Sequence, residues 1–323
     1  MTDLSFAPIK DDVFKFTMVN TVEPFLASLR KDGKFNSFDG KEIHYEYYLK
    51  DGAKANVVFC HGFTESAEKF REVYYYFINE GYNVFAVDHR GHGKSYRIPA
   101  SEPNTVKIGK FTDYSDDFNE FVNQIVKIAA PELPLYMYSH SMGGAIAIRY
   151  LETYPDVFSK AVLSAPMVCA NTGMPENVTK TLCNVAVKLG LANTKVFGKE
   201  GFDPNASYKD SNDTSEARYN YYLDKKIQNP IYRTSSPSFN WVKEAMLNTD
   251  YIIQQKNIDK ITAEILLCQP ETDKMVLPEY QNRFIAAVKN GKKTFYENAK
   301  HEIYNSTYDV LEKYYPDLFD FYG

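Results

Sequence analysis

The chain has 323 residues, of which 44% are apolar, and its formal net charge is −5. This length supplies enough apolar residues for one large core or two smaller ones. Acidic and basic residues are interleaved without a basic excess, so we expect no nucleic-acid partner. The N-terminus lacks a basic start followed by an apolar run, so no signal peptide is expected. No stretch reaches the roughly 18 apolar residues of a membrane span.

The four cysteines do not form a CxxC pair, and two of them lie in apolar, strand-like runs. They are Cys60, Cys169, Cys183 and Cys268. This usage predicts buried, reduced thiols and a cytoplasmic protein, with a disulfide or a metal site as the alternative. We predict neither a metal nor an organic cofactor.

Short β-rich segments alternate with helix-length segments along most of the chain. Residues 43–49 alternate in polarity, as expected of an antiparallel strand near the start of a sheet. Six further runs are short and mostly apolar, which is typical of parallel strands covered on both faces. These runs are 56–60, 83–87, 135–139, 160–164, 263–268 and 293–297.

Helical segments lie between and after these strands. They are predicted over 67–79, 114–129, 142–153, 278–289 and 307–321. Strands that alternate with helices indicate an α/β fold. We expect a mostly parallel central sheet, helices on both of its faces, and right-handed crossovers.

The alternation of strand and helix breaks once, between residues 167 and 233. Two helical patches, 179–189 and 216–226, flank a polar stretch at 198–214. We interpret this region as a helical lid inserted into the core, which resumes after a hinge with a helix over 239–255. The predicted organisation is a first core part at 1–166, the lid at 167–235 and a second core part at 236–323.

The strongest chemical signal is the segment 139–144, Ser-His-Ser-Met-Gly-Gly, which joins a predicted strand to a predicted helix. This context is typical of a nucleophile elbow, a sharp turn that lifts one hydroxyl above the sheet. Small residues two positions either side permit the turn. Gly143 meets this requirement, and Ser139 replaces the usual first glycine. We therefore predict Ser141 as a nucleophile, and the alternative is a glycine-rich turn with an incidental serine.

A serine hydroxyl is a poor nucleophile without a general base. Of the six histidines, only His301 follows Ser141, and it comes after the last predicted strand. In enzymes with a nucleophile elbow of this kind, the acid lies between the nucleophile and the histidine along the chain. Glu271 and Asp273 both follow the strand at 263–268, and either carboxylate is placed to orient the imidazole.

Acyl transfer also needs two fixed N–H donors for the oxyanion. We predict the backbone amide of Met142, directly after the nucleophile, and that of Phe63, in the loop after the strand at 56–60. His61 is interpreted as a residue that orders this loop. Residues 88–95 are rich in glycine and charge but lack the spacing of a phosphate-binding loop, so we interpret them as a hydrogen-bonded turn.

These motifs, in this order, resemble those of the α/β-hydrolase superfamily, in the group that contains monoacylglycerol lipases, bacterial lysophospholipases and serine aminopeptidase S33-like hydrolases. The quoted segments are HGFTES (61–66), DHRGHGKS (88–95), the elbow with its helix, LLCQPETDKMV (266–276) and AKHEIYNS (299–306). The resemblance implies the α/β-hydrolase fold. It also implies a catalytic triad of Ser141, Asp273 and His301, with Phe63 and Met142 as oxyanion donors.

Bacterial lysophospholipases are the closer resemblance. It is carried by FTDYSDDF (111–118), NDTSEARYNYY (212–222), SPSFNWVKEA (236–245) and the HEIYNS loop. It implies hydrolysis of a carboxylic ester in a single-chain lipid, with a lysophospholipid as the expected substrate. The alternatives are a monoacylglycerol lipase, a general carboxylesterase, a proline-releasing peptidase and, in a different class, a non-catalytic small-ligand binder of the same fold.

The lid is expected to supply an apolar tunnel for the acyl chain. Tyr219 and Tyr222 are candidate substrate-binding residues, because their rings are suited to a choline cation; the alternative is helix packing. The sequence has no hydrophobic anchor, so any membrane contact is expected to be transient and made by the lid. The oligomeric state is left open.

Overall fold

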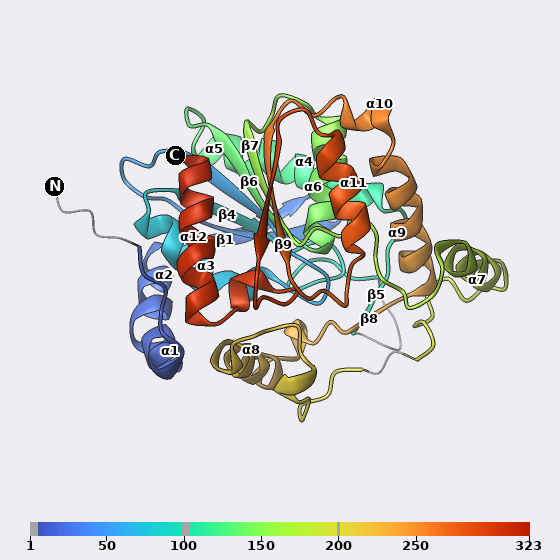
Figure 1. The fold of residues 1–323 in the computed structure, drawn as a ribbon, viewed down its shortest axis with the longest axis horizontal. Helices are drawn as coiled ribbons and strands as arrows, with labels where there is room; N and C mark the ends of the chain where they lie inside the picture. Colours follow the sequence, from blue (N-terminus) through green and yellow to red (C-terminus); the bar gives the residue numbers. More distant parts are fainter. Residues whose placement is uncertain (1–5, 99–103, 199–200) are drawn as a thin grey trace.

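The computed structural model describes residues 6–98, 104–198 and 201–323. Among them, eight strands form one sheet in the order β1-β2-β4-β3-β6-β7-β9-β10 (Figure 1). β2 pairs antiparallel with both β1 and β4, and every other neighbouring pair is parallel. The strands are β1 (Lys31–Asn36), β2 (Glu42–Tyr48), β3 (Asn56–Cys60), β4 (Asn83–Val87), β6 (Leu135–His140), β7 (Lys160–Ser164), β9 (Glu264–Pro270) and β10 (Gly291–Tyr296).

The predicted parallel sheet is confirmed, and so is the antiparallel strand at its start. β3 and β4 are buried at every position, as expected of apolar runs covered on both faces. β1 is an edge strand that was not predicted. Phe35 is its only buried residue, so no apolar run marks it.

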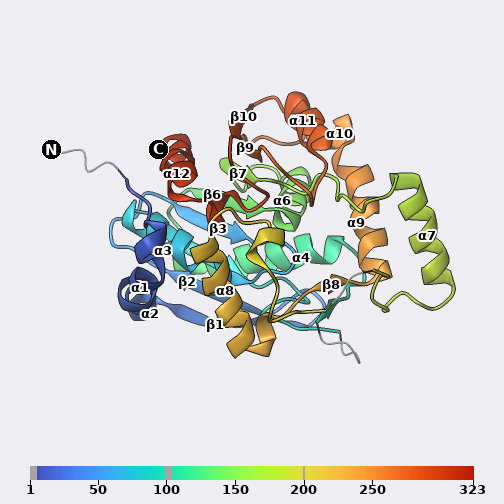
Figure 2. The same cartoon turned by 60° about the horizontal axis from the view of Figure 1, so that its bottom comes forward.

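Helices cover both faces of the sheet, also as predicted (Figures 1 and 2). One core lies under α4 (Thr112–Phe121), α6 (Met142–Thr153), α9 (Phe239–Ile252) and α11 (Pro278–Ala287). The other lies under α1 (Phe14–Thr17), α2 (Glu23–Leu29), α3 (Arg71–Asn79) and α12 (Tyr308–Tyr322). Within the described residues, no helix is long and apolar enough to cross a membrane.

Short elements extend or link these helices. η3 (Ala67–Phe70) precedes α3, and η4 (Val122–Val126) with α5 (Lys127–Ala129) continues α4 over the predicted segment 114–129. η1 (Asp11–Val13) and η2 (Met18–Val22) join α1 and α2 into an N-terminal helical segment that was not predicted. The remaining pieces are η5 (Tyr208–Asp210), η6 (Pro230–Tyr232), α10 (Gln255–Ile258) and η7 (Ile303–Asn305).

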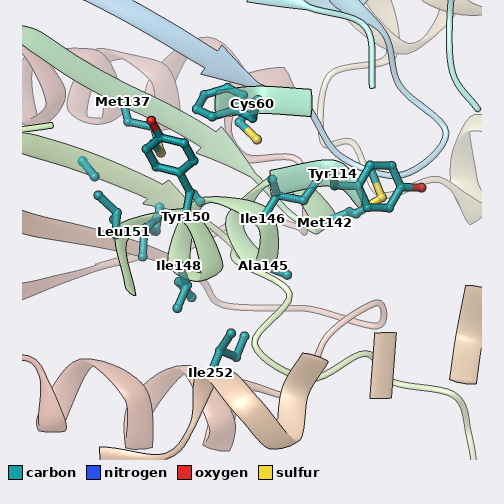
Figure 3. Packing of buried hydrophobic residues seen from close by; sticks show 14 of the residues in the cluster. Cys60, Tyr114, Met137, Met142, Ala145, Ile146, Ile148, Tyr150, Leu151 and Ile252 are labelled. Atoms are coloured by element: carbon teal, nitrogen blue, oxygen red, sulfur yellow. The ribbon is translucent and has the colours of Figure 1, made fainter. Parts of the chain in front are cut away.

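The helix α6, which follows the elbow, is buried along almost its whole length. Ile146 and Ile148 point to different sides of it, and Ile148 faces Ile252 of α9 (Figure 3). A helix that is apolar all round is suited to such an enclosed position. This packing fixes the start of α6, and with it the turn that precedes the helix.

The segment between β7 and β8 (Ser236–Pro237) holds the two predicted lid helices, α7 (Glu176–Lys188) and α8 (Glu216–Gln228). They lie apart (Figure 2). α7 packs on α9, whereas α8 contacts the N-terminal helical segment. β8 pairs with β5 (Thr105–Val106). Residues 199–200 of the polar stretch lie outside the described residues, and the role of this region as a lid stays a prediction.

All four cysteines are buried and unpaired, as predicted. Burial raises the pKa of the Cys60 and Cys268 thiols, which keeps both protonated at neutral pH.

Candidate active site

Ser141 lies at the turn between β6 and α6. Its φ of 51° and ψ of −118° are unusual for a residue with a side chain, and such backbone strain persists only where the surroundings hold it. The Ser141 amide donates to the carbonyl of Ser164 at 3.1 Å, and its carbonyl accepts from the amides of Gly144 and Met167, each at 2.8 Å. The turn is therefore fixed on both sides of the predicted nucleophile.

The residues two positions either side of Ser141 explain how this turn fits. A Cβ at Gly143 would overlap the carbonyl oxygen of Cys60, so only glycine is compatible with the approach of α6 to β3. Ser139 is fully buried, and its hydroxyl donates to the carbonyl of Val162 at 3.1 Å. The serine that replaces the usual first glycine is thus accommodated by a hydrogen bond to β7.

Two loops bring the predicted base and acid to the elbow. His301 follows β10, and its Nε2 lies 2.8 Å from Ser141 Oγ. Asp273 follows β9, and its Oδ2 lies 2.7 Å from His301 Nδ1. The amides of Met275 and Val276 donate to the other oxygen of Asp273, at 2.8 and 3.1 Å. The three side chains form the hydrogen-bonded order that activates a serine.

Glu271, the alternative acid, has a different partner. Its carboxylate accepts from the amide of Asn298 at 2.7 Å and is exposed to solvent. Of the two candidates, only Asp273 contacts His301 in the structure. The catalytic roles of these residues stay predictions.

The predicted oxyanion loop lies against the elbow. A Cβ built on Gly62 would come within 3.0 Å of Ser141 Cβ. The amides of Phe63 and Met142 donate to no other group in the described part of the chain, so both are available to an oxyanion. The Phe63 ring packs on Trp241, with 4.5 Å between ring centroids, which holds the loop in place.

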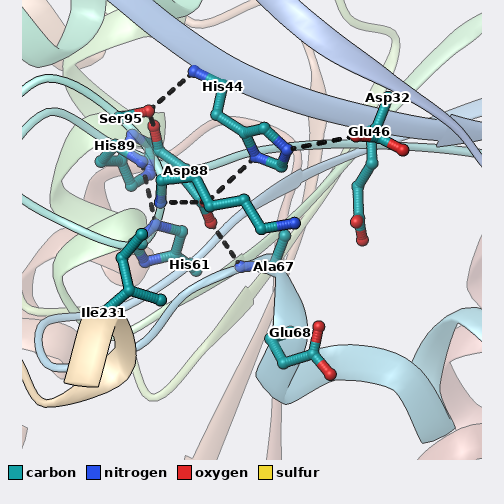
Figure 4. Close-up of polar contacts among 12 residues, drawn as sticks. Asp32, His44, Glu46, His61, Ala67, Glu68, Asp88, His89, Ser95 and Ile231 are labelled. Carbon is teal, nitrogen blue, oxygen red and sulfur yellow. Dashed lines mark hydrogen bonds and ion pairs between the residues drawn. The ribbon is translucent and has the colours of Figure 1, made fainter. Parts of the chain in front are cut away.

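The turn predicted in residues 88–95 is held by a network of hydrogen bonds (Figure 4). Asp88 accepts from the amide of Ala67 at 2.8 Å through one carboxylate oxygen. The amide of His89 donates to Nε2 of His61 at 3.0 Å. These contacts agree with the interpretation of the turn as structural and of His61 as a residue that orders the oxyanion loop.

A buried carboxylate that sequence reasoning missed, Glu65, links its own loop to the end of β6 and to the loop that carries His301. Glu65 accepts from the amide of Gly62 at 2.5 Å and from the hydroxyl of Tyr304 at 2.6 Å. Its two oxygens lie 3.0 and 3.1 Å from Nδ1 of His140. The other ring nitrogen of His140 lies 3.2 Å from the backbone carbonyl oxygen of His301. Both nitrogens of this ring thus face acceptors, which favours the doubly protonated imidazolium.

The electrostatics of this cluster agree with that protonation state. Burial raises the pKa of Glu65, but His140 and then Lys69 outweigh it and hold this pKa well below its usual range. Burial lowers the pKa of His140, but the Glu65 carboxylate outweighs it and raises this pKa. The sequence did contain one indication of this cluster, because Glu65 and His140 lie inside the site motifs HGFTES and SHSMGG.

The predicted substrate-binding residues Tyr219 and Tyr222 both line a cavity of about 280 Å³ beside α8. The cavity also reaches Thr64 in the oxyanion loop and Glu302 in the histidine loop. The hydroxyl of Tyr219 donates to the carbonyl of Ala206 at 2.9 Å, so this side chain also helps to hold the surrounding loop.

Comparison with known proteins identifies the family. The model of the family described as serine aminopeptidase, S33, matches residues 51–307. Lysophospholipase L2 of Escherichia coli (strain K12) is 28% identical over 287 residues, which cover 85% of this chain and 82% of that protein. Monoglyceride lipase of Homo sapiens is 27% identical over 291 residues, which cover 87% and 84%. A solved structure of a soluble variant of monoglyceride lipase from Saccharomyces cerevisiae, in complex with a substrate analog, matches with a TM-score of 0.70 at 20% identity, over 91% of this chain and 95% of that one. The chain has the α/β-hydrolase fold and belongs to the serine aminopeptidase S33 family.

Proposed function

We propose that this protein is a serine hydrolase that cleaves the carboxylic ester of a single-chain lipid, with a lysophospholipid as its substrate. The observation that carries the proposal is the hydrogen-bonded order of Ser141, His301 and Asp273 at a strained turn. The similarity to lysophospholipase L2 of Escherichia coli, over 85% of this chain, supports the choice of substrate.

In the proposed mechanism, Ser141 Oγ attacks the acyl carbonyl while His301 Nε2 takes its proton. Asp273 holds the imidazole in the required tautomer and stabilises the imidazolium that forms. The amides of Phe63 and Met142 donate to the oxyanion. His301 then protonates the leaving glycerol oxygen, and water hydrolyses the acyl-enzyme to release the fatty acid. All of these groups belong to the chain itself, so the reaction needs no cofactor.

A monoacylglycerol is the second candidate substrate, and the 27% identity to human monoglyceride lipase favours it. The peptide substrate that the family's description suggests has less support. A peptide N-terminus would need an uncommitted carboxylate near the nucleophile. Glu302, beside His301, already binds Lys69 at 2.5 Å and Asn305 at 3.1 Å.

The cytoplasm is the proposed location. The four buried, unpaired cysteines support it, because a reducing compartment keeps thiols in this state. Any contact with a membrane would be transient and made by the lid.

The test is fatty-acid release from lysophosphatidylcholine and monoacylglycerol of equal chain length, by the wild-type protein and by Ser141→Ala. We expect faster release from the lysophospholipid and none from the variant. Faster release from the monoacylglycerol would favour the second candidate. Equal activity of the variant and the wild type would contradict the proposed chemistry.

A further inference from the structure

Two ammonium groups lie over one aromatic ring in the cavity beside α8. Lys69 Nζ is 5.1 Å and Lys226 Nζ is 5.0 Å from the centroid of the Tyr222 ring. Lys69 comes from η3 and Lys226 from α8, and both line the cavity. Two like charges this close repel each other, and a bound anion between them would offset the repulsion.

The protein neutralises only one of these two lysines. Lys69 lies 2.5 Å from Glu302 and 3.5 Å from Glu65. Lys226 is half-buried, and within the described ranges no hydrogen-bond acceptor or carboxylate pairs with its ammonium group. Burial and then the charge of Lys69 lower the pKa of Lys226 to about 8, so its ammonium group is still charged at neutral pH.

Two of the three carboxylates that line the cavity, Asp213 and Glu302, share a partner. Asn305 Nδ2 donates to Asp213 at 2.8 Å and to Glu302 at 3.1 Å. Burial and then the charge of Glu302 raise the pKa of Asp213 well above its usual range, which favours its neutral form. Asp203 is exposed to solvent. Lys226 is therefore the lysine of this cavity whose ammonium group pairs with no carboxylate in the described part of the chain.

Two residues that line the cavity are sequence neighbours of proposed site residues. Thr64 and Glu302 line it, and they directly follow Phe63 and His301 in the chain. Consecutive Cα atoms are about 3.8 Å apart, so both lining residues lie close to the proposed oxyanion donor and base. In a lysophospholipid, only the glycerol carbons separate the acyl ester from the phosphate. A head-group site in this cavity therefore requires only a short reach from an ester held at Ser141.

We propose that this cavity is a head-group site in which Lys226 pairs with the phosphodiester anion of a lysophospholipid. The inference rests on the proposed function, because it assigns the other end of the same substrate. Tyr222 then acts as a positioning residue for Lys226. The Tyr222 ring already has two cations of the protein over it, so a choline cation is the weaker fit.

The test compares kcat/KM for lysophosphatidylcholine with kcat/KM for a monoacylglycerol of the same chain length, as a ratio. Because both values come from one sample, the ratio does not depend on the fraction of folded protein. We expect Lys226→Met to lower this ratio about 10- to 100-fold, as for loss of a hydrogen bond to a charged group. Lys226→Arg should keep most of it. Lys225→Met is the matched control, because Lys225 lies on the same helix and pairs with Glu23 and Glu68.

Each other outcome has a defined meaning. An unchanged ratio in Lys226→Met, with Ser141-dependent release from both substrates, overturns the head-group site and leaves the proposed function standing. An increased ratio in that variant also overturns it, since it would place the choline cation in the cavity. Inorganic phosphate is also titrated into the wild-type protein and into Lys226→Met. If phosphate binding needs Lys226 but the ratio of the kcat/KM values is unchanged, the cavity is a site for free phosphate and the inference is overturned. Absence of release by the wild-type protein overturns the proposed function and the inference together.

Discussion

Replacing Glu65 with glutamine tests whether the charged cluster around this residue stabilises the fold. The side chain keeps its shape and still accepts a hydrogen bond from the amide of Gly62, but it loses its charge. His140 then has no carboxylate partner, whereas Lys69 keeps Glu302 at 2.5 Å. Loss of one partner of a buried ion pair costs about 3–5 kcal/mol. Because Lys69 remains paired, we expect the lower end, about 3 kcal/mol.

The pH dependence of this loss distinguishes the pair from an ordinary hydrogen bond. The folded-state pKa of Glu65 is lowered, so its contribution is present above its unfolded pKa of about 4.3 and is lost as the pH falls. The folded-state pKa of His140 is raised, so its contribution is complete below its unfolded pKa of about 6.5 and is lost as the pH rises. The difference in unfolding free energy should therefore be largest between about pH 4.3 and 6.5.

Urea unfolding, followed by the fluorescence of the single tryptophan, measures this difference between pH 4 and 9. Glu68→Gln is the control, because Glu68 pairs with Arg71 and Lys225 and contacts no histidine. Its pKa is lowered to about 2, so the control should lose stability relative to the wild type above about pH 4.3, with no decline of this loss near neutral pH. A Glu65→Gln difference that is negligible, or that follows the control at every pH, would show that the pair of Glu65 and His140 does not stabilise the fold.

The remaining predictions concern the elbow and the acid. Ser141→Ala should lower kcat on the order of 10⁶-fold, by analogy with another serine triad, in steady-state assays of fatty-acid release. Asp273→Asn should lower kcat about 10⁴-fold while Glu271→Gln stays near wild type; the reverse order would show that the acid is misassigned. Gly143→Ala should destabilise the fold by about 1–3 kcal/mol or more in urea unfolding, because the new methyl overlaps the carbonyl of Cys60; an unchanged midpoint would contradict the tight approach of α6.

The parts of the fold that could be predicted are those with strong local patterns. The predicted runs 56–60 and 83–87 coincide with β3 and β4, since strands buried on both faces are apolar throughout. His301 could be identified because it is the only histidine after Ser141. The structure adds its contact with the serine hydroxyl, at 2.8 Å.

Other parts depend on contacts between distant segments. Glu65 and His140 are 75 residues apart in the chain, and spacing alone does not predict that they meet. The N-terminal helical segment is a different case, because its buried residues recur at every fourth position and carried a usable signal. They are Phe14, Met18, Val22 and Leu26. The edge strand β1 has no such signal and depends on pairing with β2.

Labelling by a fluorophosphonate tests whether Ser141 is an activated nucleophile, because this reagent reacts with serines that a neighbouring base activates. Peptide mass spectrometry locates the label, and His301→Ala removes the base that lies 2.8 Å from the hydroxyl. We expect a single label on Ser141 in the folded wild-type protein and a much slower reaction in the variant. An unlabelled Ser141 in the folded wild-type protein, or equal labelling rates in both proteins, would contradict this expectation.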